Sequence, residues 1–272
     1  MDWWQASEST LRLSVFGGVF LLCALAEWRW PRRQVVSARP LRWSANVAVS
    51  FIGSLLVRLA VPLLAVQAAL LASAEDWGLL NLVELPLWFS VLLSVLLLDL
   101  LIYWQHRLFH SVPLLWRLHR MHHSDTHIDV STGIRFHPVE IALSMLLKVA
   151  AVMLLGAPAL GVLLFEVLLN ASALFNHSNL RLPPSLDARL RQWLVTPDMH
   201  RVHHSWHLAE TDSNFGFCLP WWDRLFRSYR AQPDEGHQAM TIGLHAFRTD
   251  RDQRLDQLLL QPLRRVSPQE FD

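Results

Sequence analysis

Three short histidine clusters stand out in the chain, because eight of its 14 histidines fall into them. Their members are His106 and His110; His119, His122 and His123; and His200, His203 and His204. On a helix, a spacing of four residues puts two imidazoles on one face, one turn apart, where both can bind one metal ion. Adjacent histidines diverge by about 100°, so a cluster of the pattern HxxHH can reach two ions placed side by side.

The number of imidazoles favours two metal ions over one. Eight exceed the ligands of a tetrahedral zinc site, and imidazole binds iron, copper, nickel and zinc alike. A single HxxxH pair is more often chance or structural. Three clusters at one predicted membrane surface are better explained by metal binding, because histidine at membrane depth is costly unless it is paired or ligated. The pattern therefore predicts a polyhistidine di-metal site.

Composition places the chain in a membrane. Of its 272 residues, 52% are hydrophobic and only 17% charged, which is more apolar surface than one soluble domain needs to bury. The net charge is +1, so no basic footprint indicates nucleic acid. The two cysteines, Cys23 and Cys218, have no CxxC neighbour, which argues against a disulfide framework or a thiolate metal site.

Four apolar runs, 11–26, 44–73, 86–104 and 139–175, predict the elements that position the histidines. The fourth is broken at Gly156 and Pro158, which predicts a hairpin of two helices. The second is interrupted by Arg58 and Pro62; one tilted, kinked helix is preferred, with two half-helices as the alternative. We expect an all-α integral-membrane bundle of about four to five transmembrane helices with a cytoplasmic helical cap. The expected domains are N-terminal membrane helices (1–85), a catalytic domain (86–230) and a polar C-terminal tail (231–272).

The distribution of arginine predicts the orientation. The short loop after the first run is rich in arginine, whereas the loop around Glu75, Asp76 and Glu84 has no basic residue. The positive-inside rule makes the arginine loop cytoplasmic. Counting crossings then puts all three clusters on the cytoplasmic face, and the count fails if the second run crosses twice. A bacterial inner membrane is expected rather than the endoplasmic reticulum. The arginines are Arg29, Arg32, Arg33, Arg39 and Arg42.

The order of motifs HRLFH, LHRMHHS, RFHPVE, FNHSN, TPDMHRVHHS, TDSNFG and WWDRLF resembles the fatty acid hydroxylase and sterol desaturase superfamily, specifically its sterol-desaturase-type members. The resemblance runs from about residue 99 to residue 229. It implies a membrane di-iron oxygenase that uses O2 and reducing equivalents to hydroxylate or desaturate a lipid. It also implies a cap of helices over the hairpin, with the metals between the cap and the membrane.

The resemblance carries the eight clustered histidines over as metal ligands and adds His177 as a ninth. Some relatives have a second histidine four residues before that position, where this chain has Ala173. The tenth ligand is therefore open between His137, Asn170 and water. Asn170 is a candidate because a spacing of seven residues places it on the His177 face.

Three acidic residues are candidates to orient ligands. Asp99 precedes His106 by two turns, so it either accepts an imidazole N–H or pairs with Arg58 in the membrane. Glu140 stands at a predicted helix start, where the helix dipole stabilises an acid whether or not it serves chemistry. Asp198 either orients a ligand or caps its helix.

Several other residues have weaker expectations. Outside the clusters, His127 and His207 are expected in an outer shell, whereas His237 and His245 are assigned no metal. The arginines inside the clusters either help an acidic electron donor to dock or pair with local acids. The tryptophans are expected at membrane interfaces. These last two sets are Arg107, Arg120 and Arg201; and Trp28, Trp30, Trp43, Trp221 and Trp222.

The resulting expectation is a lipid-oxidising membrane enzyme with two irons, for which zinc could substitute. The sequence contains no flavin, haem or nucleotide motif, so electrons must come from a separate cytochrome, ferredoxin or reductase. A membrane metal carrier is the first rival, but it would spread its ligands toward mid-bilayer. A zinc hydrolase is the second, but HExxH is absent. The lipid is not specified by the sequence.

Overall fold

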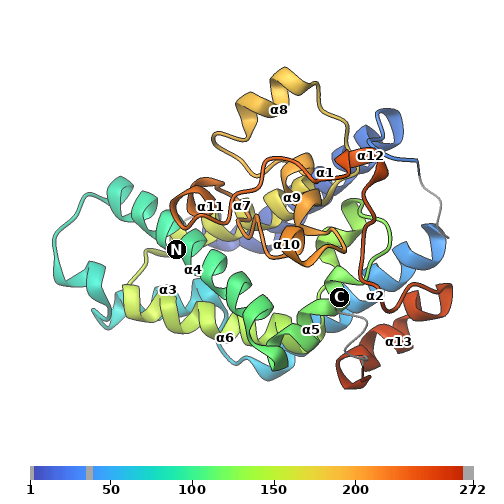
Figure 1. Ribbon diagram of the computed structural model, residues 1–272. Helices are drawn as coiled ribbons and strands as arrows, with labels where there is room; N and C mark the ends of the chain where they lie inside the picture. The colour runs from blue at the N-terminus through green and yellow to red at the C-terminus, as the bar shows by residue number, and fades with distance from the viewer. Residues whose placement is uncertain (1–2, 35–38, 266–272) are drawn as a thin grey trace.

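The computed structural model describes residues 3–34 and 39–265, and within them it contains helices and no strand. The long helices cross one another, and the short helices of the C-terminal half lie along the upper and right-hand sides of the bundle in this view (Figure 1). The long helices are α1 (Trp3–Arg29), α2 (Arg39–Ala60), α4 (Leu87–Ser111), α6 (Pro138–Leu155) and α7 (Ala159–His177). Between them are α3 (Ala65–Ala74), η1 (Leu79–Leu82), α5 (Pro113–His123) and η2 (Val130–Ile134).

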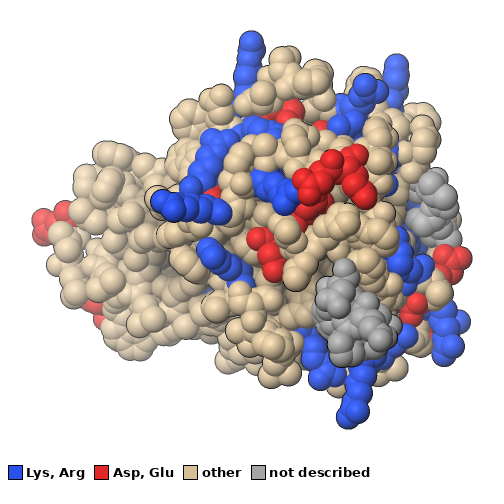
Figure 2. Space-filling view, in the orientation of Figure 1, with Lys and Arg blue, Asp and Glu red and all other residues tan. Residues whose placement is uncertain are grey.

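Five segments are long and apolar enough to cross a membrane, which confirms the predicted multi-pass bundle. They are 8–29, 39–82, 87–111, 138–155 and 159–177. Their outer faces carry exposed leucines; the exposed fractions of Leu13, Leu22 and Leu59 are 72%, 67% and 78%. Such surface suits acyl chains and would be unfavourable in water. Charged side chains gather on the cap, whereas the surface at the opposite end, around α3, is mostly uncharged (Figure 2).

The second apolar run forms two helices instead of the preferred single kinked helix. Helix α2 ends at Ala60, the chain breaks around Pro62, and α3 begins at Ala65. The proline removes a backbone donor and clashes with the preceding turn, so the helix cannot continue. At about 1.5 Å per residue, the ten residues of α3 span about 15 Å, half of the hydrocarbon core. The run is therefore divided into two helices, as the alternative had it, but only α3 is of half length: the 22 residues of α2 are enough for one crossing, and α3 does not add a second complete one.

The core of the bundle lies where α3 and α4 pack against both helices of the predicted hairpin. It includes Leu98 and Ile102 of α4, Val152 of α6, and Val162 and Phe165 of α7, all nearly inaccessible. The hairpin turns at Gly156, whose φ of 66° lies in the left-handed region that glycine tolerates without strain. The segment around Gly78 approaches this turn so closely that a Cβ there would meet the Gly156 backbone.

The cap begins after His177 and is built from short helices, listed here in order. They are α8 (Pro184–Leu190), α9 (Pro197–His203), α10 (Leu208–Thr211), α11 (Trp221–Leu225), α12 (Gly236–Ala239), η3 (Asp250–Gln253), α13 (Leu255–Leu260) and η4 (Gln261–Leu263). The cap meets the segment after α1, since Arg32 N–H donates to the Asn179 carbonyl at 2.8 Å. The domain boundaries at residues 85 and 230 stay predictions. Within the last segment, Leu258 packs against Met121 and the start of α2, so its described part is folded onto the bundle.

Candidate metal centre

Four helices end at one place and bring the histidines together. The first cluster closes α4, the second closes α5, the third occupies α9, and His177 is the last residue of α7. Pro113 and Pro197 start α5 and α9, where the missing N–H of proline costs nothing. Because each helix terminates beside the others, side chains from segments nearly 100 residues apart point into one interior volume.

Nine histidines form two groups, within each of which the ligand atoms lie within 4.8 Å of one another. One group is His106, His110, His119, His123 and His203, and the other is His122, His177, His200 and His204. The structure thus brings together the eight clustered histidines and His177. His122 and His123 enter different groups, and so do His203 and His204, as the divergence of adjacent helical residues requires.

Most of the rings are held in place by a hydrogen bond from Nδ1. The acceptor is a backbone carbonyl or a carboxylate, so Nδ1 must carry the proton. The Nδ1 groups of His106, His177 and His203 each donate at 2.7 Å to a backbone carbonyl, that of Phe215, Ala173 and Ser213, respectively. His122 Nδ1 donates at 3.2 Å to the carbonyl of Arg135. A protonated Nδ1 leaves the Nε2 lone pair of a neutral ring free to bind a metal ion.

Several Nε2 atoms face one another at distances that fit two ligands of one metal ion. His106 Nε2 lies 3.1 Å from His119 Nε2 and 3.0 Å from His203 Nε2. In the second group, His177 Nε2 lies 3.0 Å from the Nε2 atoms of both His122 and His200. Two lone pairs repel at this distance. Two imidazole nitrogens bound at about 2.1 Å to one ion, at right angles, lie about 3 Å apart.

Two carboxylates complete the support of the first group. Glu140 Oε1 accepts from His119 Nδ1 at 2.7 Å, and Asp212 Oδ1 accepts from His110 Nδ1 at 3.2 Å. Glu140 also lies in the first turn of α6, so both of its anticipated roles apply. Sequence reasoning missed Asp212, although it stands in the quoted TDSNFG motif; no spacing pattern links it to His110, which precedes it by 102 residues.

The donor set fits metal cations. The buried Nε2 atoms of His110, His123 and His204 have no hydrogen-bond partner in the described part of the chain. Burial, followed by the neighbouring imidazoles, holds the pKa of His123, His200 and His204 well below the ordinary value. The same causes lower the pKa of His203 to about 3. These rings are therefore neutral near pH 7, with lone pairs available for metal.

The loop that supplies the carbonyl acceptors is held by two buried aspartates. Asp223 accepts from the N–H groups of Phe215 and Gly216 at 2.8 and 2.9 Å, and burial raises its pKa to about 6. Asp99 accepts from the N–H groups of Cys218 and Leu219 at 3.3 and 3.2 Å and from Trp222 Nε1 at 2.9 Å. Through this loop, both aspartates position the carbonyl that fixes His106.

The expectation for Asp99 is corrected by these contacts. Its oxygens accept neither from a histidine ring nor from Arg58, because the cap loop 218–222 packs over α4 and supplies three N–H donors instead.

The family model for fatty acid hydroxylase matches residues 91–228, just over half of the chain. The chain belongs to the fatty acid hydroxylase family. The match runs from α4 to α11 and contains all nine grouped histidines.

Curated relatives of the chain include lipid hydroxylases and monooxygenases. Over 150 residues it is 33% identical to the ornithine lipid hydroxylase OlsE of Rhizobium tropici, covering 54% of this chain and 44% of that protein. It is 27% identical over 165 residues to human (Homo sapiens) alkylglycerol monooxygenase, covering 59% and 34%, and 30% identical over 181 residues to the Danio rerio enzyme, covering 63% and 38%. The chain thus matches less than half the length of these relatives. No solved structure matches it significantly.

The two candidates for a tenth ligand in this family member lie outside the groups. His137 caps α6, where its Nδ1 accepts from Val139 N–H at 3.2 Å and its Nε2 lies 3.2 Å from the Leu259 carbonyl. Asn170 donates its side-chain amide to the Glu166 carbonyl, one turn earlier in the same helix. Both ring nitrogens of His137 are therefore engaged. Pro138 begins α6 and so makes His137 its capping residue, which accounts for the Nδ1 contact.

Asp198 neither caps its helix nor contacts a grouped histidine. Thr196 is the cap of α9, and its hydroxyl accepts from Met199 N–H. Asp198 instead pairs with Arg32 at 3.0 Å and with Arg201. It therefore ties the third cluster to the segment after α1.

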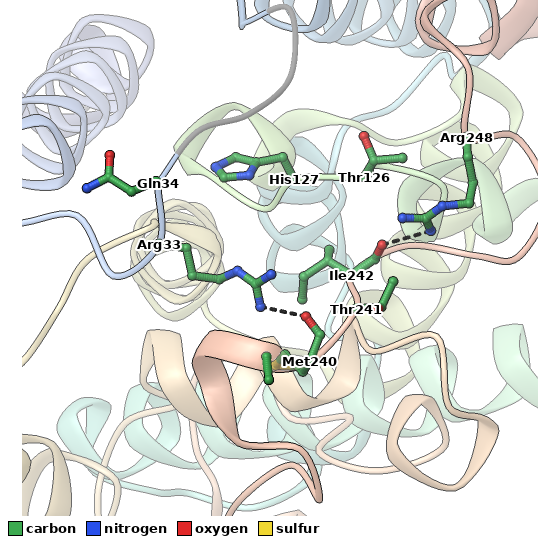
Figure 3. A pocket seen from close by; sticks show the side chains of 9 residues that line it. Arg33, Gln34, Thr126, His127, Met240, Thr241, Ile242 and Arg248 are labelled. Atoms are coloured by element: carbon green, nitrogen blue, oxygen red, sulfur yellow. Dashed lines mark hydrogen bonds between the residues drawn. The ribbon is translucent and has the colours of Figure 1, made fainter.

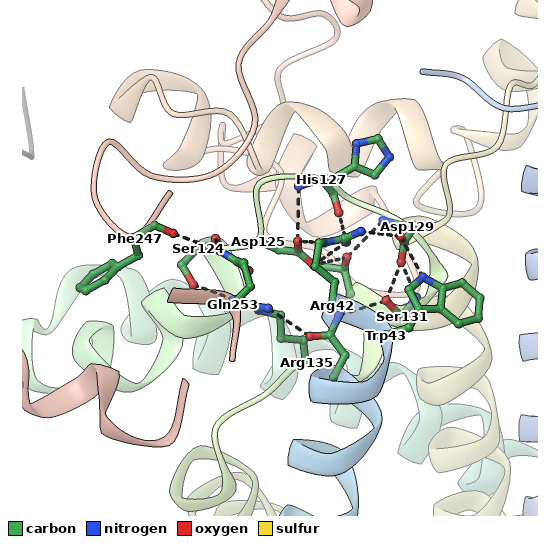
Figure 4. Close-up of polar contacts among 12 residues, drawn as sticks. Arg42, Trp43, Ser124, Asp125, His127, Asp129, Ser131, Arg135, Phe247 and Gln253 are labelled. Atoms are coloured by element: carbon green, nitrogen blue, oxygen red, sulfur yellow. Dashed lines mark hydrogen bonds and ion pairs between the residues drawn. The ribbon is translucent and has the colours of Figure 1, made fainter. Parts of the chain in front are cut away.

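A buried ion network anchors the second cluster and was not predicted (Figure 4). Arg42, expected in the short arginine-rich loop, is instead 1% exposed near the start of α2. It donates to Asp125 at 2.6 and 2.9 Å and to Asp129 at 2.9 Å. Arg135 donates to the Met121 carbonyl at 2.9 Å in the same region. Asp125 lies two residues after His123, so the network fixes the chain at the end of α5 against α2.

Of the cluster arginines, Arg120 and Arg201 are buried and so do not form a surface for an electron donor. Arg120 donates to the carbonyls of Gln261 and Arg264, and Arg201 pairs with Asp198. Arg107 donates to Tyr103 Oη at 3.3 Å and remains partly accessible.

The outer histidines and the tryptophans divide between surface and interior. His207 and His245 lie at the surface on either side of Trp206, and His237 is buried 3.6 Å from Asp198. Trp28 and Trp30 are exposed at the end of α1, as expected of an interface. Trp43 instead donates to Asp129 at 3.1 Å, because it faces the ion network.

Proposed function

We propose that this protein is a membrane-bound, O2-dependent lipid hydroxylase whose two histidine groups hold two irons. The observation that carries the proposal is the pair of groups with neutral, inward-facing nitrogens at the end of a membrane bundle. Two relatives, named as a lipid hydroxylase and a monooxygenase, favour hydroxylation over desaturation. A carrier with ligands spread toward mid-bilayer does not account for ligands gathered at helix ends.

The first group would hold one iron and the second group the other. When bound, the irons would supply the redox chemistry by which O2 is activated and one oxygen atom is inserted into a C–H bond. The balance R–H + O2 + 2e⁻ + 2H⁺ → R–OH + H2O requires an electron donor, which we propose is a separate protein. The cap excludes water from the site, and the Nδ1 acceptors keep most of the rings oriented.

The proposed substrate is a membrane lipid that enters from the bilayer. The helices that end in the histidine groups have lipid-exposed outer faces, so an acyl chain can reach the cap without crossing water. We further propose that the cap lies on the cytoplasmic face, where a soluble or membrane-bound electron donor is accessible.

Expression of the gene with and without paired ligand substitutions tests the proposal. Purified protein should contain about two irons per chain, and lipids of expressing cells should show a product 16 mass units heavier, one added oxygen. The double variant His122→Ala with His203→Ala removes one ligand from each group and should lose both iron and product. His207→Ala, which changes an exposed histidine outside the groups, is the matched control. Stoichiometric zinc with no oxidised lipid would contradict the proposal.

A further inference from the structure

A pocket of about 340 Å³ opens on the cap, separate from the histidine groups (Figure 3). Three segments far apart in the sequence form it: the chain after α1, the residues after the second cluster, and the segment that follows α12. The lining residues that matter below are Arg33, Thr126, His127, Thr241 and Arg248.

The pocket is positively charged. Arg33 Nη1 donates to the carbonyls of His237 and Met240 at 2.9 and 2.7 Å, and Arg248 Nη1 donates to those of Ile242 and Leu244 at 3.0 and 2.8 Å. These bonds hold each guanidinium in place. Within residues 3–34 and 39–265, the Nε and Nη2 groups of both arginines donate to no acceptor, so each retains a free edge.

Among the described residues, no carboxylate lines the pocket to balance this charge. The nearest acids along the chain, Asp125 and Asp129, are committed to Arg42. Asp198 is likewise paired with Arg32. Two guanidinium charges therefore face the pocket without a counter-charge from the described residues.

His127 provides a third polar group. Its side chain is 7% exposed, it lines the pocket, and its buried Nε2 has no hydrogen-bond partner in the described chain. Its backbone is fixed on both sides, because its N–H donates to Asp125 at 3.3 Å and its carbonyl accepts from Arg42. Burial, followed by the charge of Arg42, lowers the pKa of His127 to about 4, so the neutral ring offers one donor and one acceptor.

We propose that this pocket binds a phosphate group. Two planar guanidiniums with free edges match the oxygens of a phosphate dianion, and the hydroxyls of Thr126 and Thr241 add short polar contacts. The shared chemistry is the phosphate, which a phospholipid head group or a soluble phosphate ester could carry. An unpartnered buried histidine beside two arginines is otherwise an uncompensated cost of folding.

A ligand in the pocket would be connected to the third histidine cluster through backbone hydrogen bonds. The segment 240–242 lines the pocket, and Ile242 pairs with Ser205, which directly follows that cluster. Gly243 N–H donates to the His204 carbonyl, and Trp206 N–H donates to the Thr241 carbonyl, both at 3.1 Å. A bound phosphate should therefore raise the thermal stability of the cap.

Calorimetric titration of the detergent-purified, metal-loaded protein with inorganic phosphate tests the site, with chloride at matched ionic strength as the blank. We expect saturable binding that weakens about tenfold or more in Arg33→Gln and in Arg248→Gln, since each loses a charged hydrogen bond. His127→Phe should weaken binding, since it keeps an aromatic ring at this position but removes both ring nitrogens. Arg251→Gln, an exposed arginine outside the pocket, should bind as the parent protein does.

The proposal is overturned if the parent protein shows no saturable phosphate binding, or if Arg251→Gln weakens binding as much as Arg248→Gln. If Arg33→Gln lowers the melting temperature of the protein, the result for Arg248→Gln is used instead. Arg248 is exposed, and its substitution leaves the segment after α1 intact. Iron content, measured in each variant, separates this result from any failure of the proposed hydroxylase. Displacement by glycerol 3-phosphate or by dihexanoyl phosphatidate then distinguishes a soluble ester from a lipid as the source.

Discussion

His119 shows how one ring is prepared for a metal. Its Nδ1 donates to Glu140 at 2.7 Å, and its Nε2 faces His106 at 3.1 Å. A carboxylate partner fixes the tautomer and raises the basicity of the ligand. Glu140→Gln keeps the size and an acceptor but removes the charge. We expect the affinity for iron to fall about 10-fold to 100-fold, measured by competition with a chelator.

The matched control is Glu75→Gln, which changes an exposed glutamate far from the histidines. Equal iron affinity in both variants would show that the Glu140 charge does not support the site.

Two buried histidines outside the groups make stability depend on pH. Burial is the largest cause that lowers the pKa of His127 and of His237, each to about 4. In the unfolded chain their pKa is near 6.5, so the unfolded state binds more protons between pH about 4 and 6.5. The free energy of unfolding therefore falls as the pH is lowered through this window, by on the order of 1–3 kcal/mol for each residue.

Denaturation of the metal-free protein at a series of pH values measures this slope. The grouped histidines contribute to the same slope, so His237→Gln should make it shallower without abolishing it, since one of the buried histidines that resist protonation is gone. An unchanged slope would mean that His237 does not titrate in this window.

At the level of residues, the sequence predicted the histidines but not what surrounds them. Eight of the grouped histidines follow from side-chain type and spacing on helices, which are local properties, whereas His177 was expected from the family resemblance. The acceptors of Nδ1 on Phe215 and Ser213 are backbone carbonyls, which any residue could supply. Asp99 was expected to accept from a histidine ring or to pair with Arg58, whereas the cap loop supplies its donors. Such contacts depend on tertiary packing and leave no periodic signal.

Among the elements, η2 lies against α7 at a position that allows only glycine. A Cβ on Gly133 would lie 2.7 Å from the Ala173 carbonyl oxygen, the same atom that accepts from His177 Nδ1. Gly133→Ala must push α7 away and turn the His177 ring. We expect a loss of about 1–3 kcal/mol in the free energy of unfolding and weaker metal binding by the second group. Thermal denaturation and iron content are the measurements.

Gly17→Ala is the control for this substitution, because nothing lies within 4 Å of a Cβ at that position of α1. It should leave iron content unchanged. If Gly133→Ala also retains full iron content and stability, then η2 does not constrain His177.

The elements themselves were largely predictable because each has a local cause. Apolar length predicted the crossing helices, and the Gly156–Pro158 break predicted the hairpin. The division of 44–73 was less certain, since Pro62 is compatible with either a kink or a break. Packing of α3 between α6 and α7 favours the break, and that packing is a property of the bundle.

At the scale of the whole molecule, the arginine-rich segment meets the cap beside the histidine groups, since Arg32 N–H donates to the carbonyl of Asn179, two residues after His177. The cap helix α9, which carries the third cluster, lies beside the end of α1 in Figure 1. Several of those arginines serve the fold as well as the orientation. Arg42 is buried, Arg32 pairs with Asp198, and Arg39 pairs with Glu27 at 2.8 Å. The positive-inside argument therefore rests on fewer free charges than the sequence suggests, and orientation needs a direct test.

Single cysteines at the two ends provide that test. Asp234 has a side chain that is 79% exposed on the cap, and Glu75 is exposed at the opposite end. Both native cysteines are buried, and burial raises the pKa of Cys218, so background labelling should be low. With a membrane-impermeant maleimide, we expect Glu75→Cys to be labelled in intact bacterial cells and Asp234→Cys only in inverted vesicles. The reverse pattern would place the cap, and with it the entry of electrons, on the outer face.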